Sequence, residues 1–161
     1  AVSVAKSSVV GAKQVFVFVG DSPLLSAESI RALADRHQST GAACTFLTSD
    51  FTKHFPYARV IRGEDGRVTA CVEERDCTPE QVEITEYLSS HFLFDGSLLW
   101  EMLECVETHP TTGERYLTDV IDLLLAGGHR GEAVSIDDWR ELVGLNTPED
   151  VAWAEGVLAN A

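Results

Sequence analysis

The strongest hydrophobic pattern in the chain is a run of five β-branched or aromatic residues, Val15–Val19, which is too short for a helix. Such a run predicts a strand that is buried on both faces and therefore lies at the centre of a parallel sheet. The run ends at Gly20, and Asp21 follows at once. Ligands of open α/β sheets bind beyond the carboxyl ends of such strands, so Asp21 is a candidate functional residue. The alternative is that Asp21 only caps the turn.

Strand-like and helix-like segments alternate along the rest of the chain. The pattern predicts strands over 42–48, 87–94 and 133–136, helices over 1–10 and 117–126, and helices that begin after Ser26, Thr78, Asp95 and Thr147. Segments 59–62 and 67–72 flank Asp65-Gly66, a pair typical of a β-hairpin. The succession of strand, helix and strand over 15–48 predicts a right-handed βαβ unit. We therefore predict a single α/β domain over 1–161, with a mostly parallel, Rossmann-like sheet and an inserted β-hairpin.

The charge of the chain disfavours two classes of partner. It has 26 acidic and 12 basic residues and a formal net charge of −14. A nucleic-acid surface needs clustered Lys and Arg, and an anionic membrane repels an acidic chain. No stretch approaches the ~18 apolar residues of a membrane span, and the start does not have the pattern of a signal peptide. We expect no nucleic acid and no membrane partner, and a divalent cation wherever this chain handles phosphates.

The cysteines and histidines form no metal-binding pattern. The four cysteines contain no C-x-x-C pair and no zinc spacing, so we interpret them as reduced thiols of a cytoplasmic protein. The five histidines are scattered, with no H-x-x-x-H sequence. A histidine metal site is therefore not expected.

Five local motifs occur in the order known from one enzyme family. They are Gly20–Leu24 (G-D-x-P-L), Tyr57–Ile61 followed by Asp65-Gly66 (Y-G-R-[IV]-[IV]), Cys71–Asp76 (I-V-E-E-K-D), Glu114–Asp119 (E-Y-Y-L-T-D) and Gly144–Asp150 (G-V-N-[TD]-x-x-[DQ]). By these motifs the chain resembles the sugar nucleotidyltransferases, and most of all the pyrophosphorylase domain of bacterial N-acetylglucosamine-1-phosphate uridyltransferases. Each motif alone is a weak signal, but five in the correct order are fairly specific.

The resemblance implies a reaction and a set of site residues. Members transfer a nucleotidyl group, here a uridylyl group, from a nucleoside triphosphate to a sugar 1-phosphate and release pyrophosphate, using Mg²⁺. By motif match, Asp21 and Asn146 hold the Mg²⁺ ion and are the catalytic pair. Glu73 accepts hydrogen bonds from sugar hydroxyls. The remaining substrate-binding residues implied by the motifs are Tyr116, Thr118 and Arg59.

The resemblance does not extend to the start of the family's domain. The family begins with a glycine-rich loop whose backbone N–H groups hold the triphosphate, and this sequence contains no such loop. We expect that loop and the first strands, about a third of the domain, upstream of Ala1, so the chain forms roughly the C-terminal two-thirds of a nucleotidyltransferase domain. The isolated chain is then inactive. It exposes an apolar strand edge, which forms a homo-oligomer or binds the missing N-terminal segment.

Three positions of the expected sugar site also differ from the family. Ala58 replaces a glycine, Leu88 an asparagine and Ser90 a glycine. Because a leucine cannot supply amide hydrogen bonds, these changes favour an alternative function. In that alternative the chain is a non-catalytic sugar-nucleotide-binding or regulatory module that has lost the nucleotide loop. A third hypothesis, a mononucleotide binder of the flavodoxin or response-regulator type, ranks last because no lysine stands at the end of a downstream strand.

Overall fold

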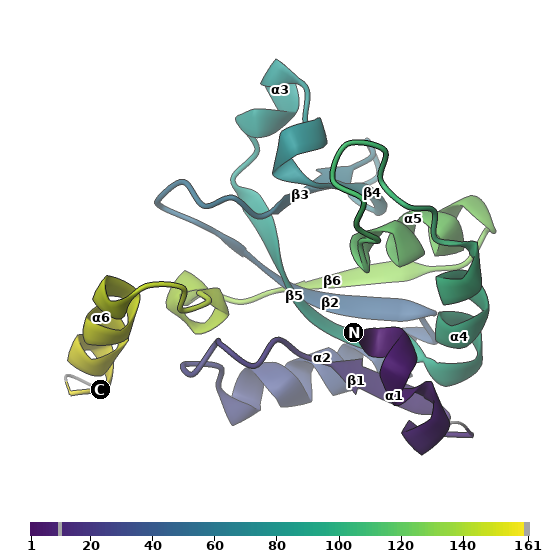
Figure 1. The fold of residues 1–161 in the computed structure, drawn as a ribbon, viewed down its shortest axis with the longest axis horizontal. Helices are drawn as coiled ribbons and strands as arrows, with labels where there is room; N and C mark the ends of the chain where they lie inside the picture. The colour runs from purple at the N-terminus through teal and green to yellow at the C-terminus, as the bar shows by residue number, and fades with distance from the viewer. Residues whose placement is uncertain (10, 160–161) are drawn as a thin grey trace.

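The structure is a computed structural model that describes residues 1–9 and 11–159 as one sheet with helices on both faces (Figure 1). Its strands are β1 (Gln14–Val17), β2 (Cys44–Asp50), β3 (Ala58–Arg62), β4 (Val68–Val72), β5 (Glu86–Asp95) and β6 (Gly131–Ser135). Its helices are α1 (Val2–Val9), α2 (Ala27–Thr40), α3 (Pro79–Val82), α4 (Gly96–Cys105), α5 (Thr118–Ala126) and α6 (Pro148–Leu158), with short 3₁₀ turns at Glu74–Asp76 and Trp139–Leu142. Residue 10 of the predicted first helix lies outside the described residues.

The strand order confirms the predicted α/β class. The sheet runs β4-β3-β5-β2-β6, and β1 pairs with β5 beside this path. Strands β1, β2 and β3 are each antiparallel to β5, and β6 is parallel to β2. Four of the strands, β1, β2, β3 and β6, therefore point in one direction. The predicted hairpin is β3 and β4, whose register pairs Arg59 with Val72.

The predicted place of the first strand in the sheet is wrong. Strand β1 has four residues and pairs, in the described part of the chain, only with β5. One edge of the ten-residue β5 is taken by β2, while its other edge is shared by β3 near Leu88 and by β1 near Phe94. The outer edge of β1 therefore remains open, and 47% of Phe16 is exposed. Strand β5 also separates β1 from β2, so the predicted βαβ unit is split.

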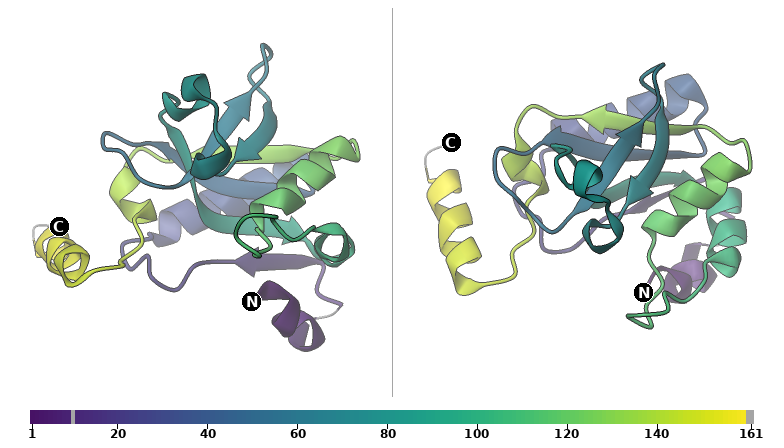
Figure 2. Two further views of the ribbon diagram at one scale, coloured as in Figure 1. Left: turned by 45° about the horizontal axis from the view of Figure 1, so that its top comes forward. Right: turned by 90° about the horizontal axis from the view of Figure 1, so that it is seen from above.

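The sheet is buried on both faces in its middle. One face packs under α4 and α5 through residues such as Phe46, Leu99 and Ile121, and the other packs under α2 through Leu33 and Leu47 (Figures 1 and 2). Neighbouring residues of β2 thus belong to opposite layers, which explains its continuous apolar sequence. The central buried strands are therefore β2 and β5, and not the segment with the most conspicuous apolar run.

Local signals set the ends of the helices as predicted. Ser26 accepts a hydrogen bond from the N–H of Ser29 at 3.1 Å and begins α2, which ends at Gly41 with a φ of +62°. Thr147 and Asp150 form a reciprocal capping box at the start of α6. None of the described helices is long and apolar enough to cross a membrane.

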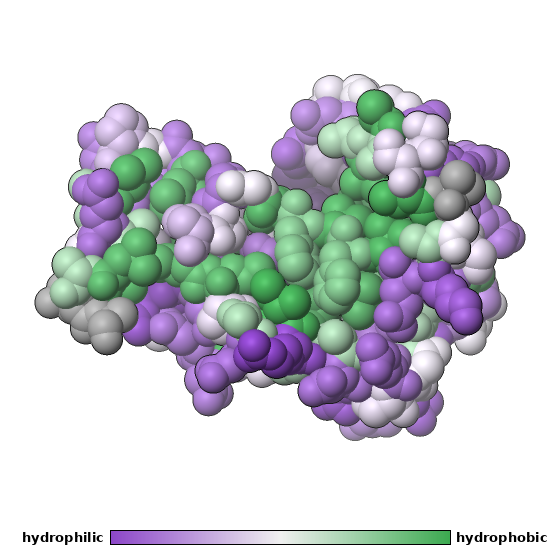
Figure 3. Space-filling view, turned by 90° about the horizontal axis from the view of Figure 1, so that it is seen from below, coloured by the Kyte–Doolittle hydropathy of each residue, from purple (hydrophilic) through white to green (hydrophobic). Residues whose placement is uncertain are grey.

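We predict that the chain self-associates through the open edge of β1. Apolar side chains form a band across the underside of the molecule, the side on which β1 lies in Figure 1 (Figure 3). Because an edge strand offers unpaired N–H and C=O groups, a second copy can pair with it. We expect the mass measured by light scattering to rise with concentration, and Phe16→Lys to reduce this rise.

Val151→Lys is the matched control, since 45% of Val151 is exposed on α6, away from the strand edge. This variant should associate like the unaltered chain. A monomeric profile of the unaltered chain at high concentration would contradict the prediction.

Candidate functional site

A cavity of about 170 Å³ lies just beyond the carboxyl end of β1. Four segments that are far apart in the sequence contribute to it: the loop after β1, the loop before β3, the middle of β5, and the loop before α6. The residues that line it are Val19, Asp21, Ser22, Tyr57, Ser89, Ser90, Leu142, Gly144 and Asn146. The structure thus brings Asp21 and Asn146 to the same cavity.

Backbone contacts fix Asp21 against the loop before α6. The N–H of Leu145 donates to the carbonyl of Asp21 at 2.9 Å. A Cβ placed on Gly144 would lie 3.2 Å from the carboxylate oxygen Oδ2 of Asp21, tighter than most real contacts of this kind. The carboxylate therefore rests on bare glycine backbone, and a side chain at position 144 would push it away. The N–H of Gly144 donates to the hydroxyl of Tyr57 at 3.0 Å.

The side-chain amide of Asn146 has a defined orientation. Its Nδ2 donates to the carbonyl of Gly144 at 3.3 Å, so its oxygen is the free polar atom of the amide. The backbone N–H of Asn146 donates to Asp150 at 2.9 Å, which ties the residue to the capping box of α6. A carboxylate and an amide oxygen are donors that Mg²⁺ accepts. In the part of the chain that the structure describes, no group of three or more His, Cys, Asp or Glu side chains could hold a metal, so water or phosphate oxygens would complete the shell of an ion bound here.

A bulge in β5 forms the floor of the cavity. The register joins Phe46 to Phe92 and Thr48 to Leu88, so the three residues 89–91 of β5 stand opposite Leu47 alone. Ser90 within this bulge has a φ of +64° and is, among the described residues, the one non-glycine residue with positive φ. Left-handed backbone at a non-glycine residue is strained and often marks a functional site. The sequence comparison with the family expected a glycine here.

The half-buried Tyr57 and the buried His91, next to the cavity, are neutral near pH 7. Burial raises the pKa of the Tyr57 hydroxyl; the N–H of Gly144 lowers it, and the carboxylates of Asp21 and Asp150 raise it. Burial lowers the pKa of the His91 imidazole, against the opposing effects of Ser89 and Asp21. The ring of His91 bonds to the hydroxyl of Ser89 at 3.2 Å, while its Nε2 has no hydrogen-bond partner among the described residues. The negative charge of Asp21 is therefore not offset by a neighbouring imidazolium.

The other predicted residues lie around the β3–β4 hairpin. The hydroxyl of Thr118, at the start of α5, donates to Oε1 of Glu73 at 2.7 Å. Glu73 also lines a separate cavity of about 420 Å³, which is formed by Pro56, Glu73, Glu74, Arg75 and Val82. The hydroxyl of Tyr116 bonds to Thr112 at 2.8 Å and to Glu114 at 3.0 Å, and the guanidinium of Arg75 lies 5.3 Å from the centre of its ring.

Arg59 is fully buried and lines neither cavity. Its guanidinium lies 4.0 Å from the centre of the Tyr87 ring, donates to the carbonyl of Tyr57, and pairs with Glu74 at 3.3 Å. It therefore holds the loop before β3 and the charged turn after β4 in place. Its Nε has no hydrogen-bond partner among the described residues, and the predicted substrate contact of Arg59 stays a prediction.

Hydrophobic patterning gave no signal for two residues that line the cavity with Asp21. Tyr57 and Ser89 are ordinary residues of a loop and a strand in the sequence. Tyr57 opens the motif Tyr57–Ile61, so only the motif comparison could have drawn attention to it.

Comparison with known proteins confirms the resemblance that the motifs indicate. The chain is 42% identical over 145 residues to the bifunctional protein GlmU of Streptomyces coelicolor, covering 89% of this chain and 30% of that protein. It is 35% identical over 159 residues to GlmU of Streptococcus thermophilus, covering 98% and 35%. The chain thus spans about a third of the length of these curated relatives. No family model matches it.

Solved structures share the fold at low sequence identity. A putative glucose-1-phosphate thymidylyltransferase from Bacillus anthracis superimposes with a TM-score of 0.72 at 14% identity, covering 99% of this chain and 60% of that one. The 4-diphosphocytidyl-2C-methyl-D-erythritol synthase of Anaerococcus prevotii gives a TM-score of 0.60 at 17% identity, covering 93% and 60%. These likenesses confirm the fold class.

We predict that Ser90→Gly stabilises the protein. Glycine adopts a positive φ without the steric cost that serine meets, so the free energy of unfolding should rise by about 1 kcal/mol. Ser90→Ala is the matched control: it removes the hydroxyl but keeps the Cβ, and it should bring no such gain. Urea denaturation of the three proteins measures the effect. Equal midpoints for the glycine and alanine variants would show that the backbone at Ser90 is not strained.

Proposed function

We propose that this chain is part of a nucleotidyltransferase domain that transfers a uridylyl group from a nucleoside triphosphate to a sugar 1-phosphate and releases pyrophosphate. The main support for the proposal is that Asp21 and Asn146 line the same cavity beyond the carboxyl end of β1. The sequence similarity to the GlmU proteins supports it. In this proposal residues 1–161 form a single unit, roughly the C-terminal two-thirds of the complete domain, which supplies the loop that cradles the triphosphate.

The carboxylate of Asp21 and the amide oxygen of Asn146 are the proposed Mg²⁺ ligands. Mg²⁺ is usually bound through one or two protein oxygens, water and the phosphates of the substrate, which fits two donors without a third acidic neighbour. When bound, the ion supplies charge neutralisation for phosphate oxygens that the acidic chain otherwise repels. Gly144 contributes by leaving the Asp21 carboxylate room and by holding the amide nitrogen of Asn146 through its carbonyl.

The sugar side is proposed at Glu73. Thr118 donates to one carboxylate oxygen of Glu73, which fixes the carboxylate and leaves the other oxygen to accept from a sugar hydroxyl. Tyr116 and Arg75 form a wall near this region, since the guanidinium of Arg75 packs on the ring of Tyr116. Arg59 acts as a positioning residue beneath it through Glu74 and the carbonyl of Tyr57.

The proposed reaction needs no covalent nucleophile on the protein. An oxygen of the sugar phosphate attacks the α-phosphorus of the triphosphate in line, a new P–O bond forms, and the bond to the β-phosphate breaks as pyrophosphate leaves. Catalysis of such a step consists of positioning and charge stabilisation. The residues of this chain hold the two substrates on either side of the loop before β3.

One observation favours the second candidate function, a sugar-nucleotide-binding or regulatory module without catalysis. Leu88 is buried and stands directly opposite Ala58, so hydrocarbon fills a place where the family has an asparagine beside a glycine. A sugar amide or hydroxyl gains no hydrogen bond there. We also propose a cytoplasmic location: all four cysteines of the chain are described, and each is a free thiol.

We predict that Asp21→Asn abolishes Mg²⁺-dependent nucleotide binding. The substitution removes the charge but keeps the shape, so calorimetry with Mg²⁺ and UTP, or with Mg²⁺ and UDP-N-acetylglucosamine, should show binding at least about tenfold weaker. Asp35→Asn on the exposed side of α2 is the matched control and should bind like the unaltered chain.

Unchanged binding by Asp21→Asn would remove Asp21 from the site. A pyrophosphate-release assay on the complete domain, with the proposed N-terminal part present, separates the two functions. Release supports the transferase, whereas Asp21-dependent binding without release supports the module.

A further inference from the structure

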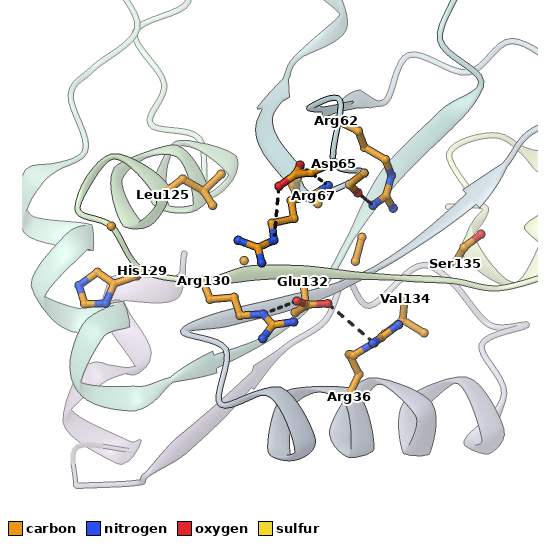
Figure 4. A pocket seen from close by; sticks show the side chains of 15 residues that line it. Arg36, Arg62, Asp65, Arg67, Leu125, His129, Arg130, Glu132, Val134 and Ser135 are labelled. Atoms are coloured by element: carbon orange, nitrogen blue, oxygen red, sulfur yellow. Dashed lines mark hydrogen bonds and ion pairs between the residues drawn. The ribbon is translucent and has the colours of Figure 1, made fainter.

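A groove of about 730 Å³, chemically different from the two cavities described above, lies along the edge strand β6 (Figure 4). The β3–β4 hairpin forms one wall with Arg62 and Arg67, and the end of α5 closes one side. Arg130 of the loop before β6 and Arg36 of α2 lie on the opposite side. The groove shares no lining residue with the Asp21 cavity or with the cavity at Glu73.

The charge of this groove is opposite to that of the chain. Four of the 12 basic residues line it, together with only two carboxylates, Asp65 and Glu132. In a chain with a net charge of −14, the groove carries an excess of two positive charges. Including Glu86, which pairs with Arg62 at the rim, still leaves an excess of one. This local positive charge attracts anions that the rest of the acidic surface repels.

Three of these arginines do not use their terminal amino groups for hydrogen bonds within the described part of the chain. Arg36, Arg67 and Arg130 each pair with a carboxylate through Nε: Arg36 and Arg130 with the same residue, Glu132, and Arg67 with Asp65. The Nη atoms of all three donate no hydrogen bond to a described residue, and the side chains are 51%, 83% and 55% exposed. The free Nη edge of a guanidinium is the fork that matches two oxygens of a phosphate.

Two arginines, Arg62 of the groove and Arg140 outside it, do use their terminal nitrogens for hydrogen bonds. Arg62 uses Nε and both terminal nitrogens on Glu86 and on the carbonyl of Gly66, so it anchors the hairpin. Arg140 grips Asp138 with both Nε and Nη2. What distinguishes the groove is that three arginines of this kind line one pocket.

We propose that this groove, hereafter the arginine groove, binds a small polyanion that carries two or more phosphate groups. Three forks on two facing walls suit a ligand with more than one phosphate. A volume of about 730 Å³ is within the usual range of roughly 300–1,000 Å³ for small-molecule sites. A nucleic acid fits less well, because the acidic surface around the groove repels an extended phosphate backbone.

Calorimetry with sodium pyrophosphate in metal-free buffer of low ionic strength tests the proposal. Without a divalent cation, the acidic Asp21 cavity does not attract pyrophosphate, so the Asp21→Asn variant should bind it as well as the unaltered chain. Arg67→Gln and Arg130→Gln should each weaken binding about tenfold, because each removes one charged fork. Arg130→Lys keeps the charge without the fork and should weaken binding to a smaller extent.

Arg140→Gln is the matched control: Arg140, like Arg130, pairs with an acid two residues away, and 47% of its side chain is exposed. It should leave binding unchanged. Absence of binding to the unaltered chain, or equal losses in Arg140→Gln and Arg130→Gln, would overturn the proposal. Citrate should bind more weakly than pyrophosphate, and citrate binding of equal strength would refute the preference for phosphate. Thermal unfolding of each variant, followed by circular dichroism, verifies that the fold is intact.

Discussion

Pairing along both edges of β5 is the constraint on which the rest of the structure depends. This strand fixes the registers of β1, β2 and β3 at once. The carboxyl end of β1 is thereby brought beside the bulge at Ser90 and close to the loop before β3. The loop before α6 then closes on Asp21 through the N–H of Leu145. The cavity is therefore a consequence of sheet register more than of any local motif.

The two proposed anion sites differ in their local charge. At the Asp21 cavity an acidic side chain and an amide oxygen face the solvent, which suits phosphate only through a cation. At the arginine groove, guanidinium groups face the solvent directly and suit phosphate without a metal. The two arrangements lie on different elements and share no residue. On a chain with a net charge of −14, each proposed site would offset the repulsion of phosphate by the surface.

Local patterns predicted the elements well and their neighbours poorly. Helix ends can be predicted from the sequence because a cap acts within one turn of the chain. The ends predicted from Ser26, Gly41 and Thr147 are confirmed. The position of β1 was mispredicted because its five-residue apolar run carries no information about β5, which pairs with it from far along the sequence. Hydrophobic periodicity alone also gave no warning that Arg59 is buried, since burial of a guanidinium depends on Tyr87 and Glu74, which come later in the chain.

Sheet geometry and motif resemblance each predicted one residue of the candidate site. Asp21 stands at the end of a strand, so its candidacy follows from sheet geometry. Asn146 came from motif resemblance alone, and the structure adds that it lines the same cavity. The positive φ at Ser90, where the family has a glycine, and the Nε2 of His91, which has no partner among the described residues, could not be predicted from hydrophobic patterning.

The measurement that tests the central claim most directly is paramagnetic broadening in the amide spectrum of the ¹⁵N-labelled chain, with Mn²⁺ in place of Mg²⁺ and UTP present. A metal held by Asp21 and Asn146 should broaden the amide signals of Gly144, Leu145 and Asn146 before all others. The same signals should remain sharp in the Asp21→Asn variant. Broadening centred on another part of the chain, or equal broadening in the variant, would contradict the account.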